Sequence, residues 1–405
     1  MFAAVAIMPK LRPLSPTAYG VYLSTPNSVT SRTEAREGQA QRLWFLGALP
    51  PPLNGQSNYN AAMLAYLSQR VEVTVLPLGE SNSAKFRRLF VNSWALLRAR
   101  RSDVAYLSLP GQMGLWLLLP VLGILRLRGI TPWCHHHSFR PINLAPSRAM
   151  QALIAVAGNG QRHILLSPGM RDRFARAYLP SRTDACVALS NAFLFGPTAT
   201  SHMARPERPV TFGHVSVLTK AKGVVYLLSL FERLHDCGHN IRLVIAGPSS
   251  DAELLLTIET YVARFPKEIE YRGPIAGDAK EAFYRDIDLF LLPTTLVDEA
   301  EPLVMLEAFA HGVDVLATNT GCIPDRILAA DRLLTLEPDT DVTLIEQRMT
   351  QLCADWVSAR DACIHHALAI NAQAQAQAET VFPALLMTDA GQRTNRLDTS
   401  RPEPS

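Results

Sequence analysis

Short apolar runs alternate with longer amphipathic stretches along most of the chain. In the first half, the short runs favour buried strands, and the stretches between them have the apolar spacing of helices. Strands are expected at Arg42–Leu46, Glu72–Leu76, Asp103–Leu107, Thr131–Cys134, His163–Leu166 and Cys186–Leu189. Strands that alternate with helices are typical of a parallel sheet covered on both faces. Residues 41–195 are therefore predicted to form one α/β domain.

A second run of the same kind follows residues 196–209, which are rich in Pro, Ser and Thr and are expected to be a linker. Its strands are expected at Val210–His214, Ile241–Ala246, Ile269–Tyr271, Ile287–Leu292 and Val313–Ala317. Residues 210–365 thus predict a second doubly wound domain. Ligands of such sheets bind outside the carboxyl ends of the strands, so function is expected at that edge.

The two ends of the chain lack this pattern. Residues 1–40 are expected to be a loose extension, 366–387 an Ala- and Gln-rich terminal helix, and 388–405 a disordered tail. The longest apolar run, Met113 to Leu125, has 13 residues. A bilayer-spanning helix needs about 20, so this run is interpreted as a buried helix.

Composition excludes a disordered or fibrous protein, because 48% of the 405 residues are hydrophobic. The net charge of +3 hides a division. Residues 1–200 carry 21 Lys and Arg against 7 Asp and Glu, whereas residues 201–405 carry 18 against 29. The chain thus joins a basic half of +14 to an acidic half of −11. Six scattered cysteines without zinc or disulfide spacing favour a cytoplasmic protein.

The stretch from Leu291 to Ile327 carries the clearest chemistry. An apolar strand runs into a polar loop with Glu299, and a helix with Pro302 in its first turn carries Glu307. The unpaired N–H groups of a helix N-terminus favour an anion such as a diphosphate. Glu299 is placed to reach a sugar ring, and Glu307 to accept hydrogen bonds from ribose hydroxyls.

The segment Glu299-Ala-Glu-Pro-Leu-Val-Met-Leu-Glu307 resembles the E-x7-E signature of the retaining, nucleotide-sugar-dependent glycosyltransferases of family 4, also called group 1, which have the GT-B fold. The resemblance implies that Glu299 contacts the donor sugar and Glu307 the ribose. It also implies that Leu303 and Val304 offer backbone N–H groups to the distal phosphate. The expected architecture is therefore GT-B: two tandem Rossmann-like domains with an interdomain cleft.

Other segments follow in the order that the family has them. Lys222-Gly223 is similar to its Lys-Gly element, in which the lysine neutralises the diphosphate and the glycine allows close approach. Five residues earlier the family often has an arginine, where this chain has Val217, so Lys220 is a candidate substitute. The resemblance also implies that Ile275 makes a main-chain contact to the base.

In the first domain, Asn54 and Gly55 lie in a strand-to-helix loop that in the family meets donor and acceptor. The resemblance implies a donor-contacting histidine at His135-His136-His137, with strand spacing favouring His136 and leaving the other two open. Asn191 corresponds to the family's asparagine before the hinge. A shared metal ion is disfavoured, because adjacent strand residues point in alternating directions.

Two acidic features need separate interpretations. Glu301 departs from the family, which usually has an aromatic or aliphatic residue there, and is expected either to alter sugar choice or to point to solvent. Asp286 and Asp288 imitate the D-x-D metal motif of the other major glycosyltransferase fold. They precede an apolar strand, far from its carboxyl end, and are interpreted as structural.

A basic amphipathic stretch from Lys85 to Arg101 leaves two interpretations. With Phe86, Leu89, Phe90 and Leu97 near helical spacing, it predicts a core-facing helix with a solvated arginine face. The alternative is contact with an anionic bilayer surface. Nucleic acid is ranked last as a partner, because no recognition motif accompanies the basic charge.

The sequence therefore predicts an enzyme: a retaining, metal-independent hexosyltransferase that needs no cofactor. It would move a sugar from a nucleotide diphosphate sugar to a hydroxyl of a glycan, expected to be lipid-linked, in cell-surface polysaccharide or lipopolysaccharide synthesis. The expected place is the cytoplasm or the cytoplasmic face of the inner membrane. The alternatives are a nucleotide-sugar epimerase or phosphorylase of the same fold, and a non-catalytic assembly partner.

Overall fold

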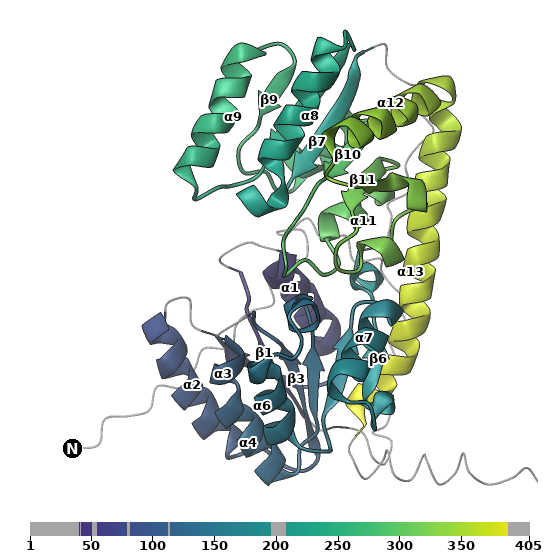
Figure 1. The fold of residues 1–405 in the computed structure, drawn as a ribbon. Coiled ribbons are helices and arrows are strands. Elements are labelled where there is room, and N and C mark those ends of the chain that lie inside the picture. The colour runs from purple at the N-terminus through teal and green to yellow at the C-terminus, as the bar shows by residue number, and fades with distance from the viewer. Residues whose placement is uncertain are drawn as a thin grey trace, which may run out of the picture.

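The computed structural model describes residues 40, 42–50, 55–78, 82–111, 114–195 and 208–387. These residues form two α/β domains, with one long helix lying along both (Figure 1). The predicted extension before residue 40, Asn54, nearly all of the predicted linker and the predicted tail lie outside the described residues.

The first domain is built on a six-stranded parallel sheet in the order β2-β1-β3-β4-β5-β6. Its strands are β1 (Arg42–Gly47), β2 (Val73–Pro77), β3 (Asp103–Ser108), β4 (Pro132–His135), β5 (Arg162–Leu165) and β6 (Cys186–Ala188). Its helices are α1 (Gly55–Ser68), α2 (Asn82–Leu96), α3 (Gly114–Leu117), α4 (Leu119–Arg128), α5 (Arg140–Asn143), α6 (Arg148–Ala157) and α7 (Pro168–Tyr178). The central strand β3 is buried along its whole length, as helices on both faces require.

The second domain repeats this plan in the order β12-β11-β10-β7-β8-β9. Its strands are β7 (Val210–Val215), β8 (Ile241–Ala246), β9 (Ile269–Tyr271), β10 (Leu289–Leu292), β11 (Asp314–Thr318) and β12 (Leu333–Leu334). Its helices are α8 (Val224–Asp236), α9 (Ala252–Arg264), α10 (Asp278–Asp286), α11 (Leu303–Ala310) and α12 (Pro338–Ala354). The chain then turns into α13 (Trp356–Leu386), which runs back to the first domain.

The predicted strands are confirmed, most of them within one residue at each end. The two-residue strand β12 has no apolar run long enough to predict it. The terminal helix begins at Trp356 rather than at residue 366, because Asp355 caps it by accepting a hydrogen bond from the Ser358 N–H. The apolar run after Met113 forms two helices, α3 and α4, instead of one.

Helix α13 ties the domains together through its polar side chains. Asn371 and Gln375 donate hydrogen bonds to the carbonyl oxygens of Ala192 and Phe193, at 2.6 and 2.8 Å. Gln377 accepts one from the Ser190 N–H at 3.0 Å. The Ala- and Gln-rich composition is thereby explained: small residues face the core, and amides satisfy the backbone between the domains.

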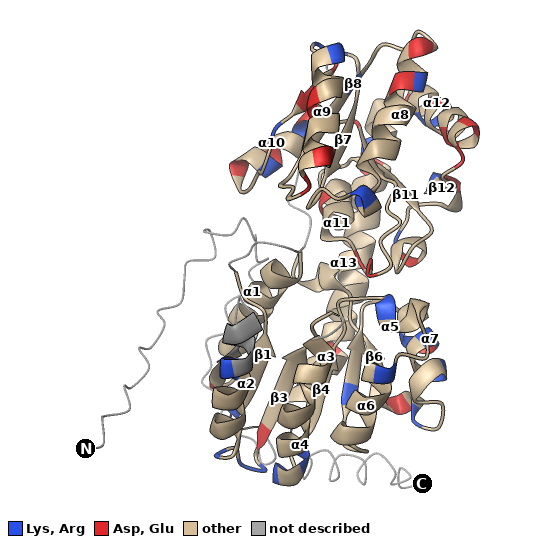
Figure 2. Cartoon of the chain, turned by 60° about the vertical axis from the view of Figure 1, so that its left-hand side comes forward, with Lys and Arg blue, Asp and Glu red and all other residues tan. Residues whose placement is uncertain are grey.

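The charge division follows the domains: in Figure 2, Asp and Glu are sparse in the first domain and frequent in the second. Within the described part of the chain, no helix is both long and apolar enough to cross a bilayer.

Candidate active site

Lys222 and Glu299 meet where strands of the second sheet end. Lys222 closes a short 3-10 turn after β7, and Glu299 lies in the loop after β10. The Lys222 Nζ lies 2.6 Å from the Glu299 Oε2, and the two side chains are 16% and 8% exposed. Thr294 donates a second hydrogen bond to the same oxygen, at 3.1 Å. The structure thus brings the predicted cation and the predicted sugar-contacting carboxylate into one group.

The backbone at position 223 and its neighbours in the protein allow only glycine. Its φ of +79° lies in the left-handed region, and a Cβ there would lie 2.0 Å from the carbonyl oxygen of Pro293. The close approach seen here is between Gly223 and the β10 loop. It holds the Lys222 turn against the loop that leads to Glu299.

Glu307 is held by two donors from α10. Its Oε1 accepts from the Lys280 Nζ at 2.6 Å, and its Oε2 from the Tyr284 hydroxyl at 2.7 Å. Burial and the nearby Glu307 carboxylate raise the pKa of Tyr284, so the phenol stays protonated and donates. Helix α11 begins at Leu303, directly after Pro302, which sits at the N-cap and not inside the first turn as the sequence suggests.

The first domain approaches the same helix end. A Cβ on Gly55, the first residue of α1, would lie 3.9 Å from the Leu303 Cδ1. The N-terminal ends of α1 and α11 therefore face each other across the domain boundary. Two predicted site segments that are far apart in the sequence are brought together here.

The three histidines alternate in direction, as expected for the end of β4. The rings of His135 and His137 lie 4.3 Å apart on the side of Tyr59. His136 turns the other way, and its Nε2 lies 2.9 Å from the His163 Nδ1. His136 is thus tied into the core of the first domain, between β5 and α7.

His137 is the least buried of the three, and its Nε2 has no hydrogen-bond partner among the described residues. Burial lowers its pKa to about 3, which keeps the ring neutral near pH 7. The His135 Nδ1 is occupied by the Tyr106 hydroxyl at 2.6 Å, and its Nε2 also lacks a partner among the described residues, but this residue is fully buried. Of the three rings, His137 has the nitrogen most available to a ligand.

The remaining predicted contacts are more peripheral. Lys220 is exposed and pairs with Glu253 at 2.6 Å, which also raises the pKa of the Lys220 ammonium. Val217 is 46% exposed. Ile275 follows β9 and packs half-buried against the core. In this conformation Lys220 is engaged at the surface and does not join the pair of Lys222 and Glu299.

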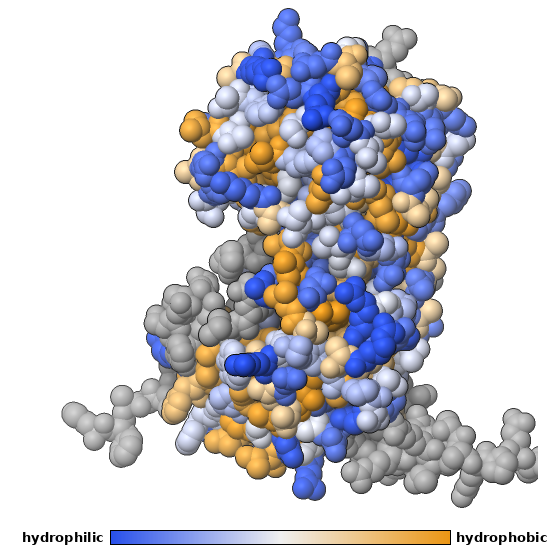
Figure 3. Space-filling model, in the orientation of Figure 1, coloured by the Kyte–Doolittle hydropathy of each residue, from blue (hydrophilic) through white to orange (hydrophobic). Residues whose placement is uncertain are grey.

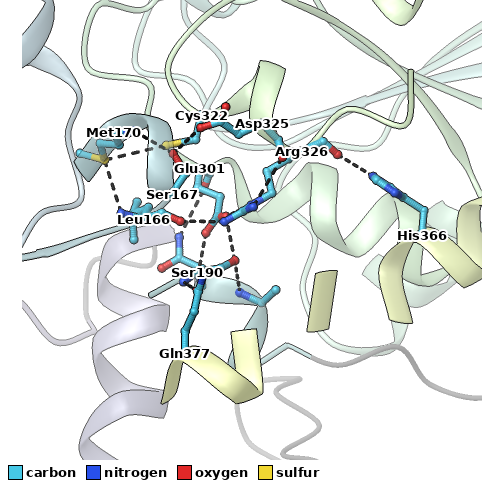
Figure 4. A network of polar contacts seen from close by, with 12 residues as sticks. Leu166, Ser167, Met170, Ser190, Glu301, Cys322, Asp325, Arg326, His366 and Gln377 are labelled. Carbon is cyan, nitrogen blue, oxygen red and sulfur yellow. Dashed lines mark hydrogen bonds and ion pairs between the residues drawn. The ribbon is translucent and has the colours of Figure 1, made fainter. Parts of the chain in front are cut away.

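The expectation that Glu301 points to solvent is wrong. Its side chain is fully buried and forms an ion pair with the Arg326 Nε at 2.5 Å. Its other contacts come from the first domain: the Ser190 hydroxyl donates at 2.8 Å and the Asn191 N–H at 2.6 Å (Figure 4). Asn191 also donates through its side chain to the Glu301 carbonyl at 3.3 Å. The predicted hinge asparagine therefore contacts the loop of the second domain that carries Glu299 and Glu301.

Asp286 and Asp288 are confirmed as structural. Asp288 accepts from Arg208 and from the Thr211 N–H, each at 2.8 Å, before β10 begins. Asp286 pairs with Arg272 at 2.7 Å. Across the described residues, no three His, Cys, Asp or Glu side chains cluster as metal ligands.

A further set of contacts across the boundary had no signal in the sequence. Asp298 accepts from the Ser138 hydroxyl at 2.9 Å and from Arg140 at 3.2 Å. Its carbonyl accepts from the Phe139 N–H at 3.2 Å. Ser167 donates to Asp325 at 2.5 Å. A cavity of about 610 Å³, lined by both domains, lies beside these contacts between Arg173 and the 295–297 loop.

Comparison with known proteins places this site in a family. Residues 200–369 match the family model described as "Glycosyl transferases group 1". This part of the chain is similar to the group 1 glycosyltransferases. The matched region contains Lys222, Glu299 and Glu307, the residues that the second domain brings to the domain boundary.

Curated relatives support the same family. A lipopolysaccharide 1,2-N-acetylglucosaminetransferase of Salmonella typhimurium is 30% identical over 124 residues, which are 26% of this chain and 29% of that protein. The sulfoquinovosyl transferase SQD2 of Arabidopsis thaliana is 26% identical over 215 residues, 52% of this chain and 36% of that protein. The chain thus spans about a third of the length of the curated relatives it matches.

Solved structures share the two-domain architecture over most of the chain. HepE of Anabaena in complex with UDP aligns over 85% of this chain and 100% of its own, with a TM-score of 0.60 and 14% identity. Sucrose-phosphate synthase of Thermosynechococcus elongatus aligns over the same shares with a TM-score of 0.61 and 16% identity. At these identities the likeness shows the fold, and the predicted GT-B fold is confirmed.

Proposed function

We propose that the chain is a retaining, metal-independent glycosyltransferase that moves a hexose-type sugar from a nucleotide diphosphate sugar to a glycan hydroxyl. The observation that carries the proposal is the pair of Lys222 and Glu299, 2.6 Å apart at the carboxyl ends of β7 and β10. The family match and the lipopolysaccharide-related relative support a role in polysaccharide or lipopolysaccharide synthesis. A lipid-linked acceptor is part of the proposal.

The second domain would bind the donor. Glu307, held by Lys280 and Tyr284, would accept hydrogen bonds from the ribose, and Ile275 would meet the base through its main chain. The N–H groups of Leu303 and Val304 open α11 and would bind the distal phosphate, with the partial positive charge of the helix end. Lys222 would turn from Glu299 toward the diphosphate as negative charge grows there.

The first domain would complete the site from the opposite side. His137 offers a neutral ring with a free Nε2, and we therefore assign the donor contact to His137 rather than to His136. With Lys222 and the helix end it would stabilise the leaving diphosphate. A leaving phosphate oxygen would take the proton of the attacking hydroxyl on the same face, which gives retention without a separate base.

The test is sugar transfer from UDP-, GDP- and ADP-sugars with EDTA present. Activity is expected to persist in EDTA and to fall about 100-fold or more in Lys222→Ala and Glu299→Ala, because each removes charge stabilisation at the reacting centre. Lys267→Ala, which removes an exposed lysine of the same domain, is the control. Strict metal dependence, or full activity in both variants, would contradict the mechanism. NMR of the enzyme and donor without an acceptor tests the alternative, because an epimerase or phosphorylase would convert the donor when no acceptor glycan is present.

We also propose that α2 and its neighbours meet an anionic membrane surface. The prediction that Phe90 and Leu97 face the core is wrong: they are 75% and 49% exposed, and Trp94 is 59% exposed. Leu127 on α4, which packs beside α2, is 84% exposed. Figure 3 shows hydrophobic surface at the lower left of the first domain, where α2 and α4 lie in Figure 1.

Basic side chains surround this apolar surface. Arg87, Arg98, Arg100, Arg126 and Arg128 are all exposed, and the Arg98 guanidinium lies 5.7 Å from the Trp94 ring centre. The apolar side chains would enter the bilayer interface, and the arginines beside them would pair with anionic lipid. Together they would hold the enzyme near a lipid-linked acceptor.

Liposome flotation tests this surface. Binding is expected with phosphatidylglycerol vesicles, to weaken with salt and to drop about tenfold or more in Phe90→Ser/Trp94→Ser, since two large side chains lose their burial. Leu256→Ser, which removes an exposed leucine of the second domain, should bind like the unaltered chain. Binding that ignores lipid charge and salt would contradict the proposal.

A further inference from the structure

Glu301 is a buried carboxylate that belongs to one domain and binds the other. It lies on the loop of the second domain between Glu299 and α11, and its side chain is fully buried. Its two oxygens together accept from Arg326, Ser190 and the Asn191 N–H, so both are satisfied. The last two donors stand at the end of the first domain (Figure 4).

Arg326, also in the second domain, contacts the first domain in the same way. Its Nε pairs with Glu301, and its Nη2 donates to the Leu166 carbonyl of the first domain at 2.8 Å. Its own carbonyl accepts from His366 of α13 at 2.7 Å. The ion pair lies within the second domain, and each of its partners would lose its contacts to the first domain if the domains separated.

The position of Glu301 links this boundary to the donor site. Glu299 lies two residues before it, and Leu303, the start of α11, two residues after it. The loop is also clamped from behind, because the Cys322 N–H donates to the Ala300 carbonyl at 2.8 Å. A Cβ on Gly321 would lie 2.4 Å from the Glu299 carbonyl oxygen. A shift of Glu301 therefore must move Glu299 or the end of α11.

Charge explains why this acid needs its arginine. A free carboxylate next to the N-terminal end of α11 would repel the phosphate that the helix end is proposed to bind. Pairing with Arg326 neutralises Glu301 and turns it toward Ser190 and Asn191, away from the helix end. The helix N–H groups are left to the ligand.

We propose that Glu301 is a positioning residue that couples closure of the two domains to the placement of Glu299 and of the α11 N-terminus. This proposal rests on the proposed glycosyl transfer. In the closed state Ser190 and Asn191 hold the paired Glu301 and so keep the loop in its reactive position. When the domains open, Glu301 loses its contacts to Ser190 and Asn191, and the loop is released.

The experiment compares Glu301→Gln with Glu379→Gln, an exposed glutamate on α13 that has no role in the site. Hydrogen exchange is followed in two peptides, 189–195 and 299–305, with and without nucleotide. In Glu301→Gln both peptides are expected to exchange at least tenfold faster, and kcat to fall about 10- to 100-fold, as for a misplaced reacting group. The Kd for nucleotide should change less than about threefold, because most of the proposed nucleotide contacts are made by residues of the second domain other than Glu301.

Three outcomes overturn the proposal: unchanged exchange in the 299–305 peptide, unchanged kcat, or a loss of nucleotide affinity equal to the loss of kcat, which would make Glu301 a donor contact. If Glu301→Gln does not fold, Ser190→Ala keeps the ion pair and removes one cross-domain bond, and should give a smaller effect of the same kind. If the unaltered chain transfers no sugar, the proposed function fails, while the exchange of the two peptides still tests the coupling.

Discussion

At the scale of single residues, the proposed donor site depends on backbone that only glycine can form. Gly223 combines a left-handed φ with direct contact to the Pro293 carbonyl, and so joins the Lys222 turn to the β10 loop. Lys222 and Glu299 meet because this contact holds their two loops together. The Lys-Gly pair is therefore one structural unit, in which the glycine places the lysine.

Gly223→Ala is expected to lower the free energy of unfolding by more than about 3 kcal/mol, because the left-handed backbone costs about 1 to 2 kcal/mol and the Cβ overlaps a carbonyl oxygen. Urea denaturation measures the change. Gly238→Ala is the control: its φ is +87°, but nothing lies within 4 Å of the added Cβ. It should cost only the backbone strain, about 1 to 2 kcal/mol. Equal losses in both variants would contradict the role of the Pro293 contact.

At the scale of elements, α13 is a helix with a weak amphipathic pattern that is held in position by its polar side chains. Alternating Ala and Gln along 372–378 have little amphipathic contrast, yet Ala374 and Ala378 are buried and Gln375 and Gln377 bind the backbone between the domains. These amides replace the hydrogen bonds that the 3-10 turn Asn191–Phe193 cannot supply itself. The helix therefore stabilises the boundary through polar contacts.

Gln377→Leu is expected to lower the free energy of unfolding by about 1 to 3 kcal/mol, because the Ser190 N–H loses its partner at a largely buried position. Gln373→Leu alters an exposed glutamine four residues earlier on the same helix. It should change the free energy of unfolding by less than about 0.5 kcal/mol. Thermal or urea unfolding of the two variants makes the comparison. A similar effect in both would show that the helix needs no amide at residue 377.

At the scale of the whole molecule, buried histidines make stability depend on pH. Burial lowers the pKa of His137 and His163 to about 3 and that of His214 to about 4, against an ordinary value near 6.5. The folded protein keeps them neutral, whereas the unfolded chain takes up protons below pH 6.5. Their contribution is thus present above the unfolded pKa and is lost as the pH falls toward the folded pKa.

Between pH 7 and pH 5, each such histidine is expected to lower the free energy of unfolding by about 1 to 2 kcal/mol. Urea denaturation at both pH values measures the total. His163→Gln removes one titrating ring and should reduce the loss by one histidine's share, even though it also removes a contact to His136. Stability that is flat from pH 7 to pH 5 would contradict the burial of these rings.

The sequence by itself determined the strands, the two sheets and which residues of the second domain lie at the candidate site. Buried parallel strands appear in the sequence as local apolar runs. Lys222 and Glu299 follow such runs along the chain, and Glu307 lies in the helix that comes after Glu299. Spacing thus placed them at the correct edge, because the carboxyl ends of parallel strands meet there. The alternation of His135, His136 and His137 also followed from strand geometry alone.

Only the tertiary structure decided the partners of Glu301 and the exposed face of α2. Glu301 reads as an exposed acid in the sequence, since Arg326, Ser190 and Asn191 come from distant segments and share no local pattern with it. Phe90 and Leu97 likewise point outward because the sheet covers the other face of the segment that carries them, which only the packing decides. Local periodicity specifies elements, whereas the pairing of buried charges and the choice of a free surface depend on how the elements are packed together.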